Sequence, residues 1–187
     1  AVKLTTLTFS ESLKKIDYGA FYGCTSLTDL TLPDSLTTVN GGGYGKYGAF
    51  NGCTALLHVK LGNGLVTISN GHDGVGDGDT DTFAYCGVFG NCSKLEEVEF
   101  NQNLVTIGNH AFSECIALKS IVLPDSVQNI GVNAFHHNTG LESASFGTGL
   151  VTIGEWAFYN CPELQTVVFR ECDTPLLTIN RYAFGRA

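Results

Sequence analysis

The stretch that decides the fold runs from residue 95 to residue 117 and reads LEEVEFNQNLVTIGNHAFSECIA. The same pattern of apolar residues returns twice, as LKSIVLPDSVQNIGVNAFHHNTG from Leu118 and as LESASFGTGLVTIGEWAFYNCPE from Leu141. The three leucines that open these stretches are 23 residues apart. Recurrence at a fixed period is typical of repeat proteins, in which each unit packs only on its neighbours.

The pattern extends in both directions over the whole chain. Its turns begin at Leu4, Leu27, Leu56, Leu95, Leu118, Leu141 and Leu164. Each turn opens with a short segment of alternating apolar and polar residues, which is the period of a β-strand, and Pro33 and Pro124 end this segment in two turns. A second short apolar segment and an Ala-Phe pair supply the other inward side chains. We therefore expect residues 1–187 to form a single, mainly β repeat solenoid. It should be a right-handed leucine-rich-repeat coil of about seven 23-residue turns, with parallel β-sheet and short 3-10 or irregular corners.

Two insertions, at residues 40–48 and 69–88, interrupt the repeat in neighbouring turns. Both leave the solenoid from the same edge, so we expect them to meet. They carry a cluster of four aromatic residues, and the predicted partner-binding surface consists of Tyr44, Tyr47, His72, Phe83 and Tyr85. Such a surface suits contact with a sugar or a protein. The alternative interpretation is that these aromatic side chains only pack the insertions onto the solenoid.

The longer insertion is rich in glycine and aspartate. Asp73, Asp77, Asp79 and Asp81 occur there with no lysine or arginine among them. Carboxylates on a flexible loop can wrap a hard cation, so these four residues are a candidate calcium site. The spacing is not that of an EF-hand loop, and a solvated loop without metal is the alternative.

Five cysteines occupy the same slot of the turn, namely Cys24, Cys53, Cys92, Cys115 and Cys161. Neighbours in adjacent turns should lie about 4.8 Å apart with parallel side chains, whereas the Cβ atoms of a disulfide need about 3.8 Å and converging directions. We therefore predict buried free thiols, with Asn138 filling this slot in one turn. Near the Phe corner we expect exposed polar histidines at His110, His136 and His137, with the rings of the adjacent pair pointing to different faces.

Composition and motifs exclude several functional classes. The net charge of −8 argues against binding to nucleic acid or to anionic membranes. The longest apolar runs fall short of the roughly 18 residues that a membrane-spanning helix needs. The sequence contains no phosphate-binding loop, nucleophile elbow, dinucleotide fingerprint or zinc-protease motif. We therefore expect a protein that is not an enzyme, requires no cofactor and does not insert into a membrane.

The repeat resembles the BspA-type leucine-rich repeat. The resemblance rests on a cysteine, three spaced leucines and a proline, followed by the Ala-Phe pair and a second cysteine: Cys24, Leu27, Leu30, Leu32, Pro33, Ala49, Phe50 and Cys53. Proteins of this family are typically secreted or surface-anchored and are associated with adhesion. The resemblance thus implies an extracellular or cell-surface module that recognises a protein or glycan on another cell surface.

A second functional hypothesis concerns the two ends of the repeat array. The pattern begins almost at residue 1 and continues to residue 187, without an evident polar cap at either end. Solenoids usually cover their open ends. Either further repeats flank this array, or the turns of one molecule stack on those of the next. The second case would make the chain a structural protein that assembles end to end into filaments.

Overall fold

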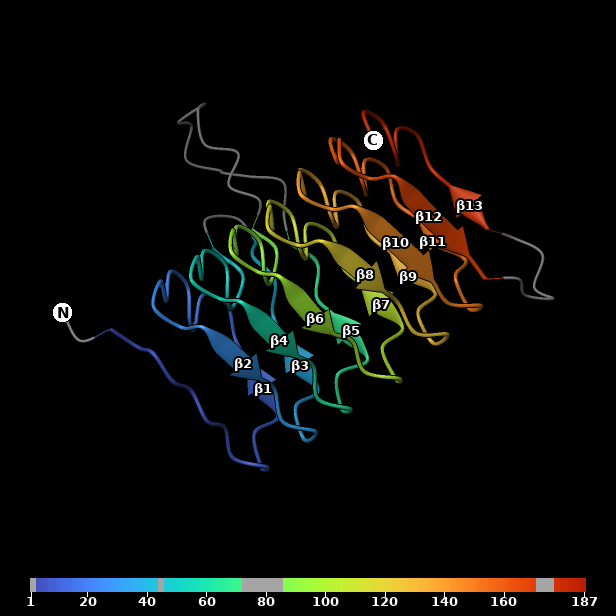
Figure 1. Ribbon diagram of the computed structural model, residues 1–187. Helices are drawn as coiled ribbons and strands as arrows, with labels where there is room; N and C mark the ends of the chain where they lie inside the picture. Colours follow the sequence, from blue (N-terminus) through green and yellow to red (C-terminus); the bar gives the residue numbers. More distant parts are fainter. Residues whose placement is uncertain (1–2, 44–45, 72–85, 171–176) are drawn as a thin grey trace.

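The computed structural model describes residues 3–43, 46–71, 86–170 and 177–187, and within them the chain winds into a stack of similar turns (Figure 1). Seven two-residue strands form one sheet: β1 (Lys15–Ile16), β3 (Thr38–Val39), β5 (Thr67–Ile68), β7 (Thr106–Ile107), β9 (Asn129–Ile130), β11 (Thr152–Ile153) and β13 (Thr178–Ile179). We call this the back sheet.

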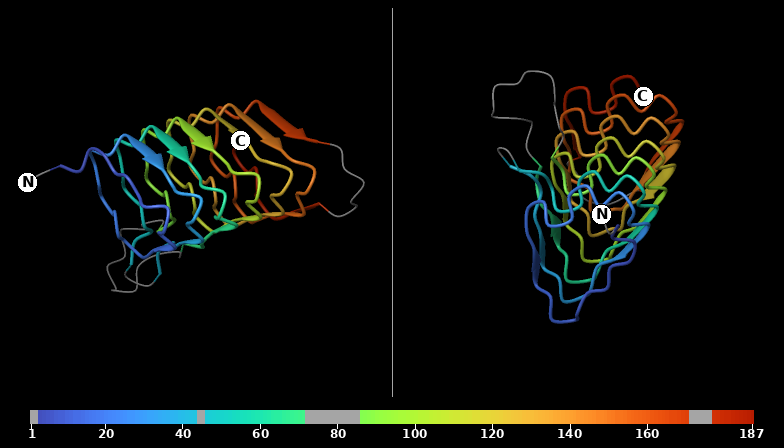
Figure 2. Two further views of the ribbon diagram at one scale, coloured as in Figure 1. Left: turned by 90° about the horizontal axis from the view of Figure 1, so that it is seen from below. Right: turned by 90° about the vertical axis from the view of Figure 1, so that its left-hand side faces the viewer.

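The strands of the opposite wall, which we call the front wall, form two three-stranded sheets. The first contains β2 (Asp29–Thr31), β4 (His58–Lys60) and β6 (Glu97–Glu99), and the second contains β8 (Ser120–Val122), β10 (Ser143–Phe146) and β12 (Thr166–Phe169). Strands β6 and β8 are neighbours in the stack, but the hydrogen-bonded pairing is interrupted between them. Seen along the stack, the two walls converge at one end of each turn and stay apart at the other (Figure 2).

All strand pairs are parallel and join equivalent positions of successive turns. In the back sheet, Ile107 of β7 pairs with Ile130 of β9, and Ile130 pairs with Ile153 of β11. This register places equivalent residues of successive turns next to each other, so each apolar position of the repeat becomes a buried column along the stack. The fold is therefore the mainly β repeat solenoid that the sequence predicts.

The longest of these columns consists of phenylalanine rings at the wide end of the turn. Phe21, Phe50, Phe89, Phe112, Phe135, Phe158 and Phe184 stack one on the next with centroid separations of 5.1–5.5 Å. Neighbouring rings are tilted by no more than 10°. The repeat favours this arrangement, because five of the seven rings follow a fully or nearly fully buried Ala whose small side chain leaves room for the ring. Phe89 follows the buried Val88 instead, and Ala20 before Phe21 is exposed. Each ring thus fills one layer of the core and covers the next.

The cysteine slot lies beside the phenylalanine column, and the six described cysteines are all free thiols. Four of the five slot cysteines are fully buried, and each donates its Sγ–H to the main-chain carbonyl of a phenylalanine in the preceding turn, over 3.3–3.4 Å. Asn138 takes the slot in one turn, where its side-chain oxygen accepts a hydrogen bond from the Cys115 amide at 2.8 Å. The prediction of buried free thiols is confirmed for these positions.

The described ends of the two insertions meet at the back of the wide end. The Gly42 amide donates to the Cys86 carbonyl at 2.5 Å. A Cβ atom on Gly48 would lie 2.1 Å from the carbonyl oxygen of Gly87, so only glycine allows the two segments to approach this closely. The insertions are therefore anchored to each other at their bases, as the sequence predicted. In the described part of the chain, no helix has the length and hydropathy of a membrane span.

Candidate functional site: an exposed tyrosine corner

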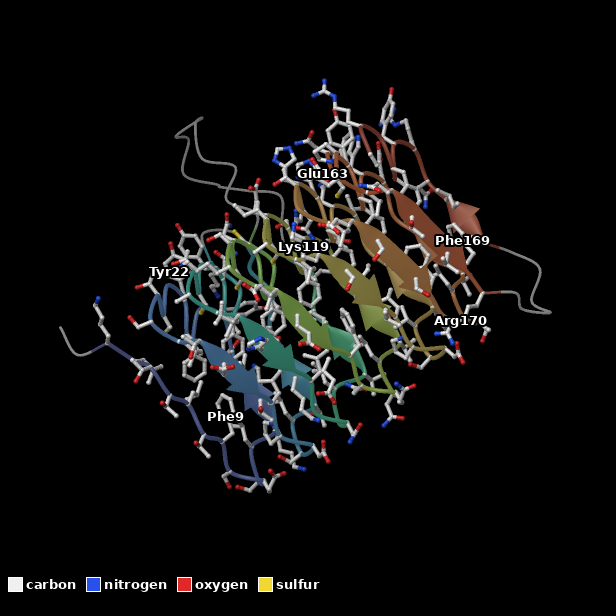
Figure 3. The ribbon with its side chains drawn as sticks, viewed as in Figure 1. Phe9, Tyr22, Lys119, Glu163, Phe169 and Arg170 are labelled. Carbon is white, nitrogen blue, oxygen red and sulfur yellow. The ribbon has the colours of Figure 1, made fainter. Side chains whose placement is uncertain are left out.

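The wide end of the first turns carries a cluster of partly exposed aromatic side chains. Tyr22, which lies at this end of its turn (Figure 3), stacks on Tyr47 of the shorter insertion with a centroid separation of 3.7 Å and an interplanar angle of 11°. Tyr22 and Tyr47 remain 47% and 38% exposed. A hydrogen bond between Tyr22 and Tyr47, followed by burial, raises the pKa of Tyr22 above its ordinary value. The phenol of Tyr22 is therefore a neutral hydrogen-bonding group at physiological pH.

A shallow depression of about 440 Å³ lies next to this pair. It is lined by Asp17, Tyr18, Gly19, Lys46 and Tyr47. The ammonium group of Lys46 lies 5.0 Å from the centroid of the Tyr18 ring, and Tyr18 is 47% exposed. We refer to Asp17, Tyr18, Tyr22, Lys46 and Tyr47 together as the tyrosine corner.

The carboxylate of Asp17 is fixed in its charged form. The side-chain amide of Asn40 donates to Asp17 Oδ1 at 2.6 Å, and the Tyr18 amide donates to the same oxygen at 2.9 Å. These two bonds, and then the contact with Lys15, lower the pKa of Asp17 to about 2. The tyrosine corner thus combines aromatic surface with a fixed anion and a cation, which suits a polar partner that also presents apolar surface.

The predicted site residues have different outcomes. Tyr47 lies in the tyrosine corner, where it both packs against the solenoid and keeps part of its surface exposed. The other predicted residues lie outside the described part of the chain: Tyr44, His72, Phe83, Tyr85 and the candidate calcium ligands Asp73, Asp77, Asp79 and Asp81. Their roles in partner and calcium binding remain predictions.

Sequence reasoning missed Tyr18 and Tyr22, which occupy variable positions of an ordinary turn. Nothing in the spacing within that turn marks them, since their equivalents elsewhere are not consistently aromatic. The sequence signal that could have found Tyr22 is its position in the stack, because equivalent positions of successive turns lie next to each other. Residues at the same wide end in the next turn belong to the glycine-rich insertion, so an aromatic residue there is brought over Tyr22.

The front wall offers a different, charged surface. Polar contacts connect successive turns here: Asp29 and His58 share a hydrogen bond of 2.9 Å, and ion pairs join Lys60 with Glu99 at 2.7 Å and Lys119 with Glu142 at 3.1 Å. A depression of about 580 Å³ lies where the two front sheets adjoin, and Glu97, Glu99 and Lys119 are among its lining residues. Lys119 is labelled in Figure 3. Because these polar contacts are exposed to solvent, each contributes little, and this surface offers less to a partner than the tyrosine corner.

The stacked turns and parallel register define a leucine-rich-repeat protein, a fold that typically serves as a non-enzymatic binding scaffold. Solved structures agree. A leucine-rich repeat protein from T. pallidum is 28% identical, with a TM-score of 0.67, and the match covers 88% of this chain and 66% of that one. A leucine-rich repeat protein from Bacteroides ovatus ATCC 8483 is 24% identical, with a TM-score of 0.64, over 82% of this chain and 34% of that one.

The family is shown by a sequence model for the BspA type leucine rich repeat region, which matches residues 1–72 and 84–187 in six copies. The chain therefore belongs to the BspA-type leucine-rich repeat family, as the resemblance of the repeat indicated. No match was found among curated proteins. The chain spans 66% and 34% of the length of the two solved relatives.

Proposed function

We propose that the chain is a non-catalytic recognition module that acts at a bacterial cell surface and binds a protein or glycan through the tyrosine corner and the adjacent insertions. The observation that carries the proposal is the exposure of Tyr18 and Tyr47 at one depression, with Tyr22 stacked on Tyr47, beside a fixed carboxylate and a lysine. Tyrosine supplies a large contact area at low entropic cost, and it is enriched among the residues that dominate binding energy. The resemblance of the repeat to BspA-type proteins, which are typically secreted or surface-anchored, supports a location at the cell surface.

The solenoid explains why such a site can be specific. The tyrosine corner is built on the stacked turns, and the hydrogen bonds from the Asn40 side chain and the Tyr18 amide hold the carboxylate of Asp17 in place. Tyr47 is oriented by its stacking on Tyr22. A partner therefore binds without first ordering these side chains, which lowers the entropic cost of association.

The test uses two variants that should fold equally well. Tyr18→Ala removes an exposed ring beneath Lys46, and Tyr182→Ala removes a ring that is 58% exposed and lies beneath Arg181 at the other end of the stack. We expect fluorescently labelled protein with Tyr18→Ala to lose roughly tenfold or more in affinity for bacterial or host cells and for any glycan retained on an array. Protein with Tyr182→Ala should bind like wild type.

Equal binding by both variants would place recognition elsewhere. Deletion of residues 70–81, which retains Tyr18 and Tyr47, separates the two parts of the proposed surface. We expect the deletion to leave folding intact and to abolish binding if the long insertion makes the contact. A deletion protein that binds normally while Tyr18→Ala does not would confine the site to the tyrosine corner.

End-to-end self-association is a second candidate function. In the last turn, Phe169, Leu177 and Ile179 are 41%, 40% and 47% exposed, whereas Ile153, the partner of Ile179 in the preceding turn, is fully buried. Another copy stacked on this turn would cover these side chains. Sedimentation velocity provides the test, since a concentration-dependent series of larger species supports filament growth and a strictly monomeric profile rejects it.

A further inference from the structure

Three potential metal ligands gather at the wide end of two neighbouring turns, away from the tyrosine corner. Glu114 ends one turn, and His136 and His137 end the next. One ligand atom from each residue lies within 4.8 Å of the other two. The Nδ1 atom of His137 is already 3.0 Å from Oε1 of Glu114.

The backbone of the repeat holds this arrangement. Glu114 and His137 occupy the same position in successive turns, and both adopt a left-handed conformation, with φ of 61° and 58°. The Glu114 amide donates to the His136 carbonyl at 2.9 Å, which aligns the two turns at this point. The carboxylate and the imidazole are thus placed next to each other by the stacking register rather than by side-chain flexibility.

The two histidine rings lie side by side instead of pointing to different faces, which corrects the expectation from the sequence. Their centroids are 4.1 Å apart, with an interplanar angle of 10°. His136 is only 8% exposed, and His110 is fully buried, so these two are not the exposed polar residues that were expected. The side chains of His137 and Glu114 remain 37% and 30% exposed, so an ion can reach the cluster from solvent.

We propose that Glu114, His136 and His137 bind a divalent first-row transition-metal ion, with Zn²⁺ as the probe, and that water completes the coordination. Two imidazoles and one carboxylate form a donor set that suits Zn²⁺ better than Ca²⁺ or Mg²⁺. Ligand atoms at the usual bond lengths of a tetrahedral zinc site lie about 3.3 Å from one another. The contact between His137 and Glu114, at 3.0 Å, is already close to this separation. Binding requires the stacked rings of His136 and His137 to rotate so that one nitrogen of each points at the ion.

The experiment follows the histidine rings directly. The chain has five histidines, and two-bond ¹H–¹⁵N spectra at pH 7 resolve the ring nitrogens of each. On addition of one equivalent of Zn²⁺, we expect the signals of His136 and His137 to shift or broaden while those of His58 stay in place. His58 is a matched internal control, because it pairs with Asp29 at 2.9 Å but has no third ligand in the described structure.

Calorimetric titration with Zn²⁺ supplies the affinity. We expect Glu114→Gln to weaken binding at least tenfold and His58→Asn to leave it unchanged. Glu114→Gln keeps the size of an exposed side chain, and its circular dichroism spectrum checks that it folds. If Zn²⁺ leaves the His136 and His137 signals of the wild-type protein unperturbed, or if Glu114→Gln binds Zn²⁺ as wild type does, the site does not exist.

Discussion

Truncation of one ring in the middle of the phenylalanine column should destabilise the solenoid strongly. Phe112 is fully buried and contacts three rings, at centroid distances of 5.2 Å from Phe89, 5.4 Å from Phe135 and 5.8 Å from Phe100. Replacing a buried Phe with Ala costs roughly 3–5 kcal/mol from lost transfer free energy and the cavity. Each aromatic pair adds about 0.5–1.5 kcal/mol beyond its buried area. We therefore expect Phe112→Ala to lower the free energy of unfolding by about 5 kcal/mol, the upper end of the range for such truncations.

Two further variants divide this cost into its parts. Phe112→Leu retains most of the buried volume but removes three ring contacts, so it should cost about 1.5 kcal/mol. Phe184→Ala removes a half-buried ring that stacks on Phe158 alone, and it should cost less than half as much as Phe112→Ala. The comparison of Phe112 with Phe184 thus measures the contribution of neighbours on both sides.

Equilibrium unfolding in urea provides the assay, followed by circular dichroism for the whole stack and by fluorescence of Trp156, the single tryptophan. Solenoids unfold by nearest-neighbour coupling, so the two signals should separate when the Phe112 layer is lost. A cost below about 2 kcal/mol for Phe112→Ala would contradict the account of the core. Equal losses of unfolding free energy for Phe112→Ala and Phe184→Ala would also contradict it.

Three further predictions concern titrating groups. Burial raises the pKa of Cys53 to about 12, so an alkylating reagent at pH 8, with peptide mapping, should modify half-buried Cys24 well before Cys53; equal rates would contradict this. The lowered pKa of Asp17 confers stability that is present above pH 3.8 and lost as the pH falls through about 2; Asn40→Ala should raise this pKa toward 3.8 in an NMR titration, and an unchanged value would refute the role of the amide. The lowered pKa of His136 confers stability that is present above pH 6.5 and lost as the pH falls toward 4, so urea midpoints of the wild type should decline over this window and those of His136→Asn should decline less; parallel curves would argue against it.

The sequence predicts the buried columns of the fold because each is repeated at a fixed period. Leu118, Ile130 and Phe135 have equivalents in every complete turn, and parallel register stacks them whatever the variable residues are. Even Asn138, which departs from the pattern, could be assigned to its slot by counting. Periodicity therefore determines the core and the sheets.

The sites depend on contacts that periodicity does not encode. Alternation along an extended chain would separate the rings of His136 and His137, but the left-handed φ of 58° at His137 ends the alternation and leaves the rings stacked. Tyr18 and Tyr22 join Tyr47 only because a glycine-rich insertion folds back over the preceding turn. Such positions lie at the corners, where the conformation of one residue redirects its neighbours.

The two insertions are anchored at their bases, so the residues beyond these bases can vary in evolution without disturbing the core. The hydrogen bond from Gly42 to Cys86 closes the bases of both insertions outside the stacked core. Doubling the length of a loop that is closed in this way costs only about 0.6 kcal/mol of chain entropy. Sequence and length can thus vary beyond these bases while every layer of the stack stays intact. The solenoid is a permissive frame on which unrelated peptide segments could be grafted, by evolution or by design.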